Sequence, residues 1–384
     1  MTNPVYLDHN ATTPLDPRVF AVMEPHFTTI VGNPSSIDHL HGHLASQAVE
    51  NSRDLVARSI GCKSRDIVFT SGCTESNNLV ILGLAAADQT PKHIITSQIE
   101  HPAILEPCRR LELAGWSITR VPVNEEGLVD ARSVESALRP ETALVTIMGA
   151  NNEVGTIQPL AAIGEICRRH NVPFHSDLAQ LAGDGGIDIE ALGLSLASFS
   201  AHKMYGPKGG GVLYINPRRG GARLAPLLSG GGQERNLRPG TLNTPAIVGM
   251  SEAFRLMKID GARDHERVGA LRDELWLRLA ENVSDIERNG SSNRLANNLS
   301  VSITGVEPLA LMRKIRETAS VSASSACATG KVETSHVLLA MFGDGPRARR
   351  ALRLSPGRFT TEADIDRVAK AIIPAIEGLR KFAA

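Results

Sequence analysis

An alternation of strand-like and helix-like segments over residues 66–177 constrains the fold of this chain more than any other feature. Short apolar segments rich in β-branched residues alternate with segments of helical periodicity, and short polar turns join them. We expect strands at 66–70, 92–97, 117–121, 143–148 and one that ends near Asp177, and helices at 79–87, 101–114, 130–138 and 160–170. Such repeated units predict an α/β fold with a mainly parallel large sheet that has helices on both faces.

One lysine, Lys203, stands in an unusual stretch that runs from Ser198 to Gly211. Hydroxyl, glycine and apolar residues surround it, and an apolar strand follows at 212–215. Burial among such neighbours penalises the charged form of an amine, so this lysine could lose its proton and form a Schiff base with an aldehyde. Pyridoxal 5'-phosphate (PLP) is the aldehyde cofactor of amino-acid chemistry, and it also needs a carboxylate for its pyridine nitrogen.

Asp177 is the candidate carboxylate, because it lies where a strand ends and open α/β sheets bind ligands at the carboxyl ends of their strands. Taken alone, Lys203 could be an ordinary loop lysine and Asp177 a helix N-cap. Together, each beside a strand, the two residues favour a PLP site.

The segment 70–78 joins a strand, a glycine turn and hydroxyl residues to a helix, which is an anion-binding arrangement. It lacks the pattern of a nucleotide P-loop, so a cofactor phosphate fits better, with simple capping by Thr74 as the alternative. Thr241, after a glycine-rich stretch that begins at Ser229, offers a second hydroxyl to a phosphate. His101 follows a strand and could stack over a pyridine ring and move protons, although a lone histidine is more often structural.

The end of the chain is expected to form a smaller α+β domain after a long helical region at 245–280, with strands at 299–303, 320–323 and 351–354. Cys327 lies there in a run of small residues, and the thiolate of an exposed cysteine near a cation is a nucleophile; an inert cysteine is the alternative. An arginine that follows could clamp a substrate carboxylate through two N–H bonds, the candidates being Arg349, Arg350, Arg353 and Arg358. We divide the chain into an N-terminal arm at 1–14 that joins the small domain, a large PLP-binding domain at 15–255 and a small domain at 256–384.

Charge and composition argue against several classes of function. The 41 acidic and 41 basic residues give no net charge and hence no basic field for direct nucleic-acid binding. No apolar run reaches the about 18–20 residues of a membrane span, and the first residues do not resemble a signal peptide. The five cysteines are scattered, which favours a reducing cytoplasm. We expect no metal at the histidine cluster 39–43, whose spacing fits no known ligand set and where Gly42 is expected to interrupt a helix.

With these residues laid out, the chain resembles the cysteine desulfurases of the NifS/IscS type, which are fold-type I, class-V aminotransferase-like PLP enzymes. The resemblance runs nearly from end to end and rests on motifs at residues 6–14, 32–36, 70–76, 100–101, 151–155, 175–180, 200–203, 230–235, 325–327 and 357–360. It implies the fold-type I architecture and a homodimer with active sites at the subunit interface.

The resemblance also implies roles for individual residues. Lys203 matches the Schiff-base lysine, Asp177 the partner of the pyridine nitrogen, and His101 the histidine stacked on the ring. The other implied cofactor ligands are Gln180 and Asn152 near the ring hydroxyl, and Thr74, Ser200, His202 and the partner subunit's Thr241 at the phosphate. Arg353 matches the arginine at the substrate carboxylate, Asn152 is a further substrate-binding residue, and Cys327 matches the persulfide carrier. Two departures stand out: Cys73 replaces a common alanine and puts a second thiol near the phosphate, and Pro239 replaces a small residue before Thr241.

The implied reaction takes sulfur from L-cysteine to the Cys327 thiolate and leaves L-alanine, with Lys203 moving the α-proton. A mobile loop would let Cys327 reach both the cofactor and an acceptor. Two rival hypotheses are a class-V aminotransferase, which would not need Cys327, and a sulfur-relay scaffold without PLP chemistry. Iron–sulfur assembly, tRNA thiolation and DNA phosphorothioation all use similar enzymes, and the neutral charge favours a protein acceptor in each case.

Overall fold

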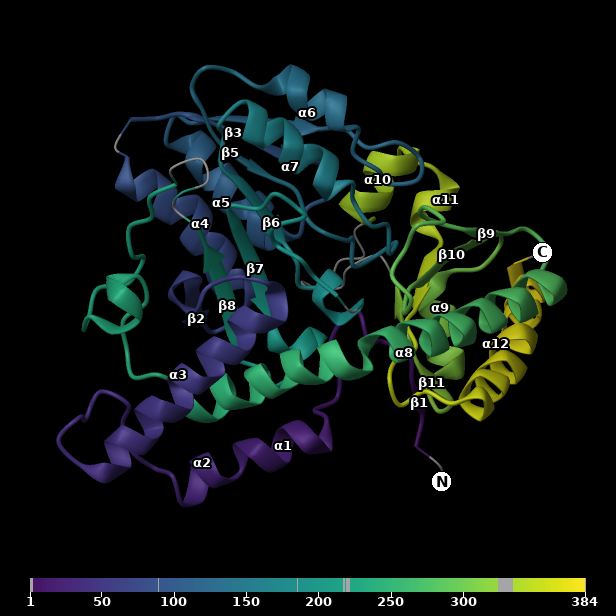
Figure 1. The fold of residues 1–384 in the computed structure, drawn as a ribbon. Helices are drawn as coiled ribbons and strands as arrows, with labels where there is room; N and C mark the ends of the chain where they lie inside the picture. The colour runs from purple at the N-terminus through teal and green to yellow at the C-terminus, as the bar shows by residue number, and fades with distance from the viewer. Residues whose placement is uncertain are drawn as a thin grey trace.

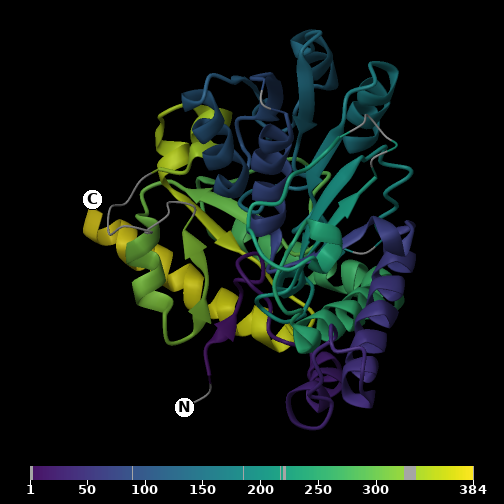
Figure 2. The ribbon, with the colours of Figure 1, turned by 90° about the vertical axis from the view of Figure 1, so that its left-hand side faces the viewer.

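The computed structural model describes residues 3–88, 90–184, 186–216, 218, 222–323 and 334–383. They form two bodies, each built around its own sheet, with the N-terminal segment between them (Figures 1 and 2). Among the helices of the described residues, none combines the length and the hydrophobicity needed to cross a bilayer.

Seven of the described strands form the sheet of the larger body, in the order β2-β8-β7-β6-β5-β3-β4. The pairs among β7, β6, β5, β3 and β4 are parallel, whereas β8 runs antiparallel to both β2 and β7. The bounds are β2 Ile67–Thr70, β3 His93–Ser97, β4 Ser117–Val121, β5 Thr142–Thr146, β6 Phe174–Asp177, β7 Leu196–Ser200 and β8 Gly211–Ile215. The predicted α/β fold with a mainly parallel large sheet is therefore confirmed.

Helices cover both faces of this sheet, because successive strand residues point to opposite sides. In β2, Val68 packs in a cluster with α4 (Cys73–Ala87) and α5 (Pro102–Leu113). Its neighbours Ile67 and Phe69 face the opposite cluster, which includes Val19 and Met23 of α1 (Pro17–Met23) and residues of four further helices. Those helices are α3 Leu40–Ile60, α6 Ala131–Ala137, α7 Leu160–Arg169 and α8 Thr244–Asn282.

The smaller body contains a four-stranded antiparallel sheet in the order β12-β13-β10-β9, packed against helices. The N-terminal strand β1 (Val5–Tyr6) joins this body by pairing in parallel with β11 (Ala319–Ser320). The remaining bounds are β9 Ile286–Arg288, β10 Leu299–Ile303, β12 Ser322–Ala323, β13 Ala351–Leu354, α9 Pro308–Ile315, α10 His336–Phe342, α11 Pro346–Arg349 and α12 Glu362–Ala383.

The 39-residue helix α8 belongs to both bodies. Met250 and Met257 lie in the core of the large sheet, and Leu271 and Leu279 lie in the core of the small sheet. The boundary that we predict between residues 255 and 256 therefore falls within one continuous helix, and the division into domains stays a prediction.

Two local expectations are wrong. Gly42 does not interrupt a helix: α3 begins at Leu40, and a Cβ at Gly42 would lie only 1.8 Å from the carbonyl oxygen of Ser36, so glycine permits a close backbone approach. Helix α4 begins at Cys73, earlier than the predicted 79, with Gly72 as its N-cap. Thr74 therefore lies inside the first turn, and its side chain does not cap the helix.

Candidate active site

A cavity of about 640 Å³ opens where the parallel strands β6 and β7 end. Asp177 is the last residue of β6 and Ser200 the last residue of β7. Most of the residues singled out in the sequence line this cavity, namely Cys73, Thr74, His101, Asn152, Asp177, Gln180, Ser200, His202, Lys203 and Arg353. The strand ends thus bring together side chains that lie far apart in the sequence, as expected for this class of sheet.

Lys203 ends a short 3₁₀ turn, Ala201–Lys203, that follows β7 directly. Its Nζ donates to the carbonyl oxygens of Asn10 at 2.6 Å and Ala11 at 2.8 Å. Burial, and after it the positive charge of Arg353, lower the pKa of Lys203 to about 8, although the Asp177 carboxylate opposes the shift. A substantial fraction of this amine is therefore neutral near pH 7–8, as a nucleophilic lysine requires.

Tyr205 fixes the turn that carries Lys203. Its φ of 64° is in the left-handed region, and its backbone N–H donates to Thr13 Oγ1 at 2.8 Å. Its hydroxyl accepts from the backbone N–H of Arg358 at 2.6 Å, and the Arg358 guanidinium lies 4.3 Å from the ring centroid. The lysine turn is thus held by the N-terminal segment on one side and by the segment before α12 on the other.

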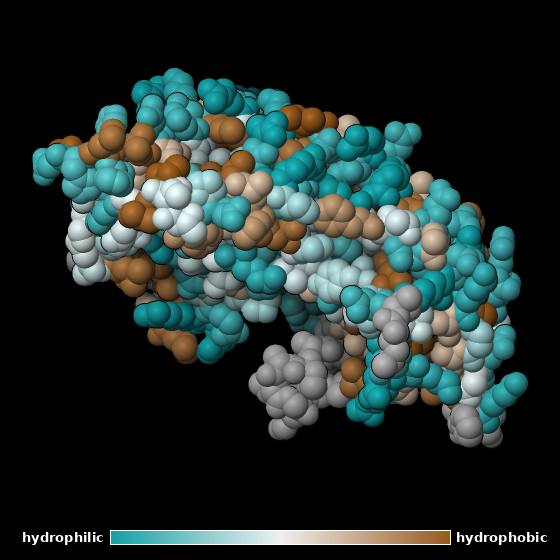
Figure 3. Space-filling model, turned by 90° about the horizontal axis from the view of Figure 1, so that it is seen from below, coloured by the Kyte–Doolittle hydropathy of each residue, from teal (hydrophilic) through white to brown (hydrophobic). Residues whose placement is uncertain are grey.

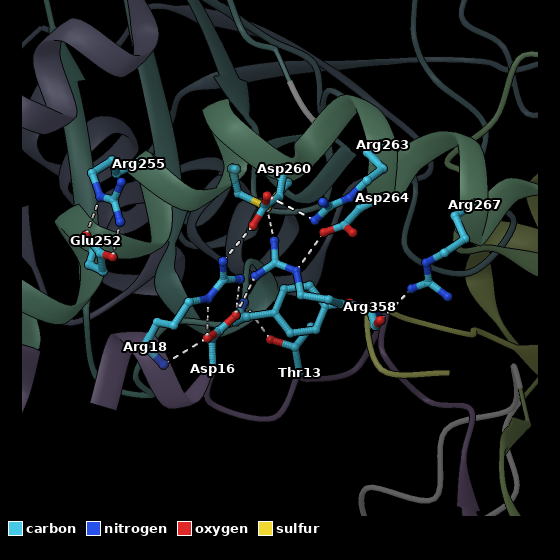
Figure 4. Close-up of polar contacts among 12 residues, drawn as sticks. Thr13, Asp16, Arg18, Glu252, Arg255, Asp260, Arg263, Asp264, Arg267 and Arg358 are labelled. Atoms are coloured by element: carbon cyan, nitrogen blue, oxygen red, sulfur yellow. Dashed lines mark hydrogen bonds and ion pairs between the residues drawn. The ribbon is translucent and has the colours of Figure 1, made fainter. Parts of the chain in front are cut away.

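A network of buried ion pairs extends from Arg358 (Figure 4). Its guanidinium donates to Asp16 Oδ2 at 2.8 Å and to Asp264 Oδ2 at 2.6 Å. Arg18 bridges Asp16 and Asp260, each at 2.8 Å. The network joins the start of α1 (Pro17–Met23), the middle of α8 and the segment before α12, so it fixes three distant parts of the chain beneath the lysine turn.

Asp177 accepts three hydrogen bonds that fix its carboxylate. Oδ2 accepts from Asn77 Nδ2 at 2.7 Å, and Oδ1 accepts from the Ala179 backbone N–H at 3.0 Å. The Cys73 thiol donates to Oδ1 at 3.1 Å, so it faces this carboxylate. Burial, and after it the Asp177 charge, raise the pKa of Cys73 well above its ordinary value, which keeps the thiol neutral.

The start of α4 lies at the cavity and has the features of an anion-binding helix end. Its N-cap, Gly72, has no side chain to satisfy the first-turn N–H groups, which the helix dipole makes attractive to a phosphate. The chain is tight here, because a Cβ at Gly211 would lie 2.4 Å from Gly72 Cα. Thr74 and Ser200 add hydroxyl groups to the same cavity.

Burial lowers the pKa of two histidines in the cavity. His202 Nδ1 lies 3.1 Å from Thr12 Oγ1, and burial lowers the pKa of His202 to about 4, with Lys203 and Lys208 lowering it further. His101 caps α5, and its Nδ1 accepts from the Ala103 backbone N–H at 3.1 Å. His101 lines the cavity, and desolvation by the surrounding protein lowers the pKa of its ring.

Arg353 lies on β13 of the smaller body and lines the same cavity as Lys203. Its Nη1 donates to the Asn152 carbonyl oxygen at 2.9 Å and its Nη2 to Asp8 Oδ1 at 2.6 Å. Its Nε is buried and has no hydrogen-bond partner in the described part of the chain. An arginine with an unused N–H at a cavity can donate hydrogen bonds to a bound carboxylate.

Two predicted residues are not brought to the cavity by the described structure. Thr241 is exposed and does not line it. Cys327 lies outside the described residues. The described chain before Cys327 ends at Ala323 in β12, which pairs with β13, so that Ser322 is opposite Arg353.

Sequence reasoning missed a set of residues in the N-terminal segment: Asp8, Asn10, Ala11 and Thr12. Asn10 Nδ2 donates to Gln180 Oε1 at 3.1 Å, and Gln180 Nε2 donates back to the Asn10 carbonyl oxygen at 2.8 Å. The signal was available, because these polar residues stand in the motif at 6–14. Their partners, however, are far away in the sequence, so nothing local indicated the contact.

Glu100 is a second omission. It is buried, and its Oε1 accepts from Ser97 Oγ at 2.6 Å and from the Met148 backbone N–H at 3.0 Å. Burial raises the pKa of Glu100 to about 8, so this side chain is a neutral acid near pH 7. Among the described residues, no group of His, Cys, Asp and Glu is arranged to hold a metal ion.

Comparison with known proteins gives one consistent family. Residues 5–368 match the family model for Aminotransferase class-V. The chain is 43% identical to "Cysteine desulfurase IscS" of Rickettsia conorii, over 100% of this chain and 93% of that protein. It is also 43% identical to "Cysteine desulfurase, mitochondrial" of Arabidopsis thaliana, over 99% of this chain and 84% of that protein.

Solved structures agree with this result. A NifS-like protein superposes with a TM-score of 0.90 at 36% identity, covering 98% of this chain and all of the other. SspA in complex with cysteine superposes with a TM-score of 0.81 at 35% identity, over 94% of this chain and all of the other. The predicted fold-type I architecture is confirmed by these neighbours.

Proposed function

We propose that this chain, which belongs to the Aminotransferase class-V family, is a cysteine desulfurase that removes sulfur from L-cysteine and leaves L-alanine. The relatives named cysteine desulfurase match it over its full length. The observation that carries the proposal is the buried Lys203 amine, with a pKa of about 8, in one cavity with Asp177 and with Arg353, whose Nε has no partner among the described residues.

We propose PLP as the cofactor, and the residues at the cavity fit its polar groups. Lys203 would hold the aldehyde carbon, Asp177 the pyridine nitrogen, and the start of α4 the phosphate, together with Thr74, Ser200 and His202. His101, Gln180 and Asn152 would contact the ring and its hydroxyl. When bound, PLP supplies an electron sink for bond breaking at the substrate's α-carbon.

The chain's own residues supply substrate binding and proton transfer. Arg353 would hold the α-carboxylate of L-cysteine through its unused N–H groups. The Lys203 amine is partly neutral near pH 8. It can therefore take the proton from the α-carbon of L-cysteine and return it to a neighbouring carbon. The neutral His202 adds no positive charge beside Lys203 and therefore does not lower the pKa of the amine further.

Cys327 is the proposed sulfur acceptor. Its thiolate would attack the substrate's sulfur and form an S–S bond while the substrate's C–S bond breaks. The electron pair stays with the carbon skeleton, which takes up a proton and leaves as L-alanine. Cys327 follows β12 in the sequence, and β12 lies beside the strand of Arg353.

We propose a homodimer, in which Thr241 of each subunit completes the phosphate site of the other. Two features support it: Thr241 is exposed and does not line its own cavity, and large apolar side chains are exposed from α1 to the start of α3. They are Phe20, Phe27, Val31, Ile37 and Leu40, of which Phe27 lies on α2 (Pro25–Thr28). Figure 3 views the side on which α1 and α2 lie and shows apolar surface among polar residues.

The acceptor of the persulfide is proposed to be a protein, because the chain has no net charge to attract nucleic acid directly. Iron–sulfur assembly, tRNA thiolation and DNA phosphorothioation remain candidate pathways. A reducing cytoplasm remains the proposed location, and the four cysteines of the described residues are all unpaired.

The test is a Cys327→Ser variant supplied with L-cysteine under reducing conditions, with alanine, sulfide and pyruvate measured. We expect loss of both alanine and sulfide formation, and a Cys62→Ser variant as matched control should behave like the wild type. Undiminished alanine formation in Cys327→Ser would rule out the persulfide role. Amino-group transfer to a 2-oxo acid by that variant would favour the class-V aminotransferase hypothesis, and a wild-type protein that binds no PLP would favour a scaffold.

A further inference from the structure

Asp8 is the acidic residue that touches the proposed substrate arginine. Its Oδ1 lies 2.6 Å from Arg353 Nη2, and the two side chains are 19% and 9% exposed. On the other side of the guanidinium, Nη1 donates to the Asn152 carbonyl oxygen at 2.9 Å. Each terminal nitrogen of Arg353 therefore has one fixed partner.

The backbone at Asp8 is fixed as well. The Ser355 N–H donates to the Leu7 carbonyl oxygen at 2.7 Å, and the His9 N–H donates to the Ser355 carbonyl oxygen at 3.2 Å. These bonds place Asp8 in a parallel bridge with Ser355, two residues after Arg353. The Asp8 carboxylate is therefore attached to a segment that is paired with the arginine's own strand.

The remaining donors of Arg353 are left for a ligand. A guanidinium has five N–H donors, and Asp8 and Asn152 use two of them. Nε is buried without a partner in the described part of the chain, and Arg353 lines the cavity. A carboxylate that binds through two parallel N–H bonds needs only two of the three donors that remain.

We propose that Asp8 is a positioning residue for substrate binding: together with the Asn152 carbonyl, it fixes the plane of the Arg353 guanidinium so that Nε and a neighbouring N–H face the substrate's α-carboxylate. This inference rests on the proposed function. A rival account treats Asp8 as a competing counter-ion that the substrate must displace. The two accounts predict opposite changes in substrate affinity when Asp8 is removed.

The experiment compares Asp8→Asn and Asp8→Ala with the wild-type PLP-loaded enzyme. Positioning predicts that KM for L-cysteine rises about tenfold in Asp8→Ala and by less in Asp8→Asn, which keeps an acceptor oxygen, while kcat changes less than about threefold. A lower or unchanged KM in both variants would overturn the proposal. Asp366→Asn, which removes a charge from an exposed pair with Lys370, is the matched control and should leave KM unchanged.

A second measurement isolates the carboxylate. Cysteamine has the amine and the thiol of cysteine but no carboxylate, and its binding can be followed by the change in cofactor absorbance. We expect the dissociation constant of cysteamine to be unchanged in Asp8→Asn and that of cysteine to rise. Equal weakening of both ligands would contradict the proposal, because it would indicate general damage to the site.

A third measurement tests whether Asp8 acts through Arg353. In an Arg353→Lys background, Asp8→Asn should have little further effect on KM, because lysine has no guanidinium plane for Asp8 to fix. An undiminished, additive effect would show that Asp8 acts elsewhere. Melting temperature and bound PLP show whether a variant folds. If Asp8→Ala fails to fold, the result for the milder change, Asp8→Asn, decides. Wild-type protein without cysteine turnover would defeat the proposed function, whereas normal turnover with an unaffected Asp8→Asn would defeat only this inference.

Discussion

The two walls of the cavity are built in different ways. The lysine wall consists of Asp177, Ser200 and Lys203, which lie at or just after the ends of two adjacent parallel strands. The arginine wall joins Arg353 on the small sheet to Asp8, a residue 345 positions away, and to the carbonyl of Asn152 in the larger body. The first wall follows from the topology of one sheet, whereas the second exists only when both bodies and the N-terminal segment are assembled.

This difference separates the chemistry from the selection of the substrate. The lysine wall holds the groups that would bind the cofactor and move protons. Its strands belong to a continuous core, and the N-terminal segment and Arg358 hold the turn that carries Lys203. The arginine wall would recognise the substrate's carboxylate, and it lies next to the strand that precedes Cys327. Changes to the first wall should therefore affect kcat most, and changes to the second should affect KM most.

The largest effect is expected from Lys203→Ala. Loss of a positioned proton-transfer group typically costs 10²–10⁴-fold, so kcat for alanine formation should fall roughly a thousandfold or more. The measurement is single-turnover alanine release from PLP-loaded protein, with Lys208→Ala as control, since this exposed lysine also lines the cavity. Comparable rates for the two variants would break the assignment of the lysine wall.

Arg358→Ala should destabilise the support beneath that wall. The change leaves Asp16 and Asp264 as buried carboxylates without this partner, and breaking a buried pair costs about 3–5 kcal/mol. Urea unfolding would measure the loss. Arg255→Ala is the matched control, because Arg255, which pairs with Glu252 on the same helix, is exposed, and the pair should contribute less than about 1 kcal/mol (Figure 4). Equal losses in both variants would show that the network adds no special support.

The pH dependence of cofactor uptake tests the environment of Lys203. Its pKa is lowered from 10.5 to about 8, so the neutral, reactive amine increases as pH rises through 8. About a tenth of the amine is neutral at pH 7 and about nine tenths at pH 9, so the rate of PLP uptake by apoprotein should rise about ninefold between them. A rate still rising steeply above pH 10 would mean that the amine is not desolvated.

The smallest effect is expected from Cys73→Ala. The variant loses one thiol hydrogen bond to Asp177, which keeps its bonds from Asn77 and from the Ala179 backbone. The dissociation constant for PLP should change by less than about threefold. If the dissociation constant for PLP changed more than tenfold in Cys73→Ala but only slightly in Cys73→Ser, the hydrogen bond from position 73 would be shown to orient the Asp177 carboxylate.

The lysine wall was predictable from the sequence because it depends on local signals. Strand periodicity located β6, which ends at Asp177, and the stretch 198–211 singled out Lys203. The strand β7 was not predicted, and Ser200 was assigned through the family resemblance. The start of α4 was placed too late, because the glycine and hydroxyl residues before 79 resemble a loop, although Gly72 alone supplies the turn.

The arginine wall was only partly predictable. Arg353 could be selected from four candidates through the family resemblance, but its partner Asp8 had no local signal, because the contact depends on the pairing of the N-terminal segment beside β13. For the same reason the contacts of Asn10 and Ala11 with Gln180 and Lys203 became visible only in the folded chain.

The central claim is that Lys203 is the covalent anchor of PLP. Its most direct test is borohydride reduction of the PLP-loaded protein, followed by proteolysis and mass spectrometry of the peptide that contains residues 198–211. We predict a pyridoxyl-phosphate group on Lys203 and none on Lys208. A reduced protein that carries the group on another lysine, or on none, would contradict the account.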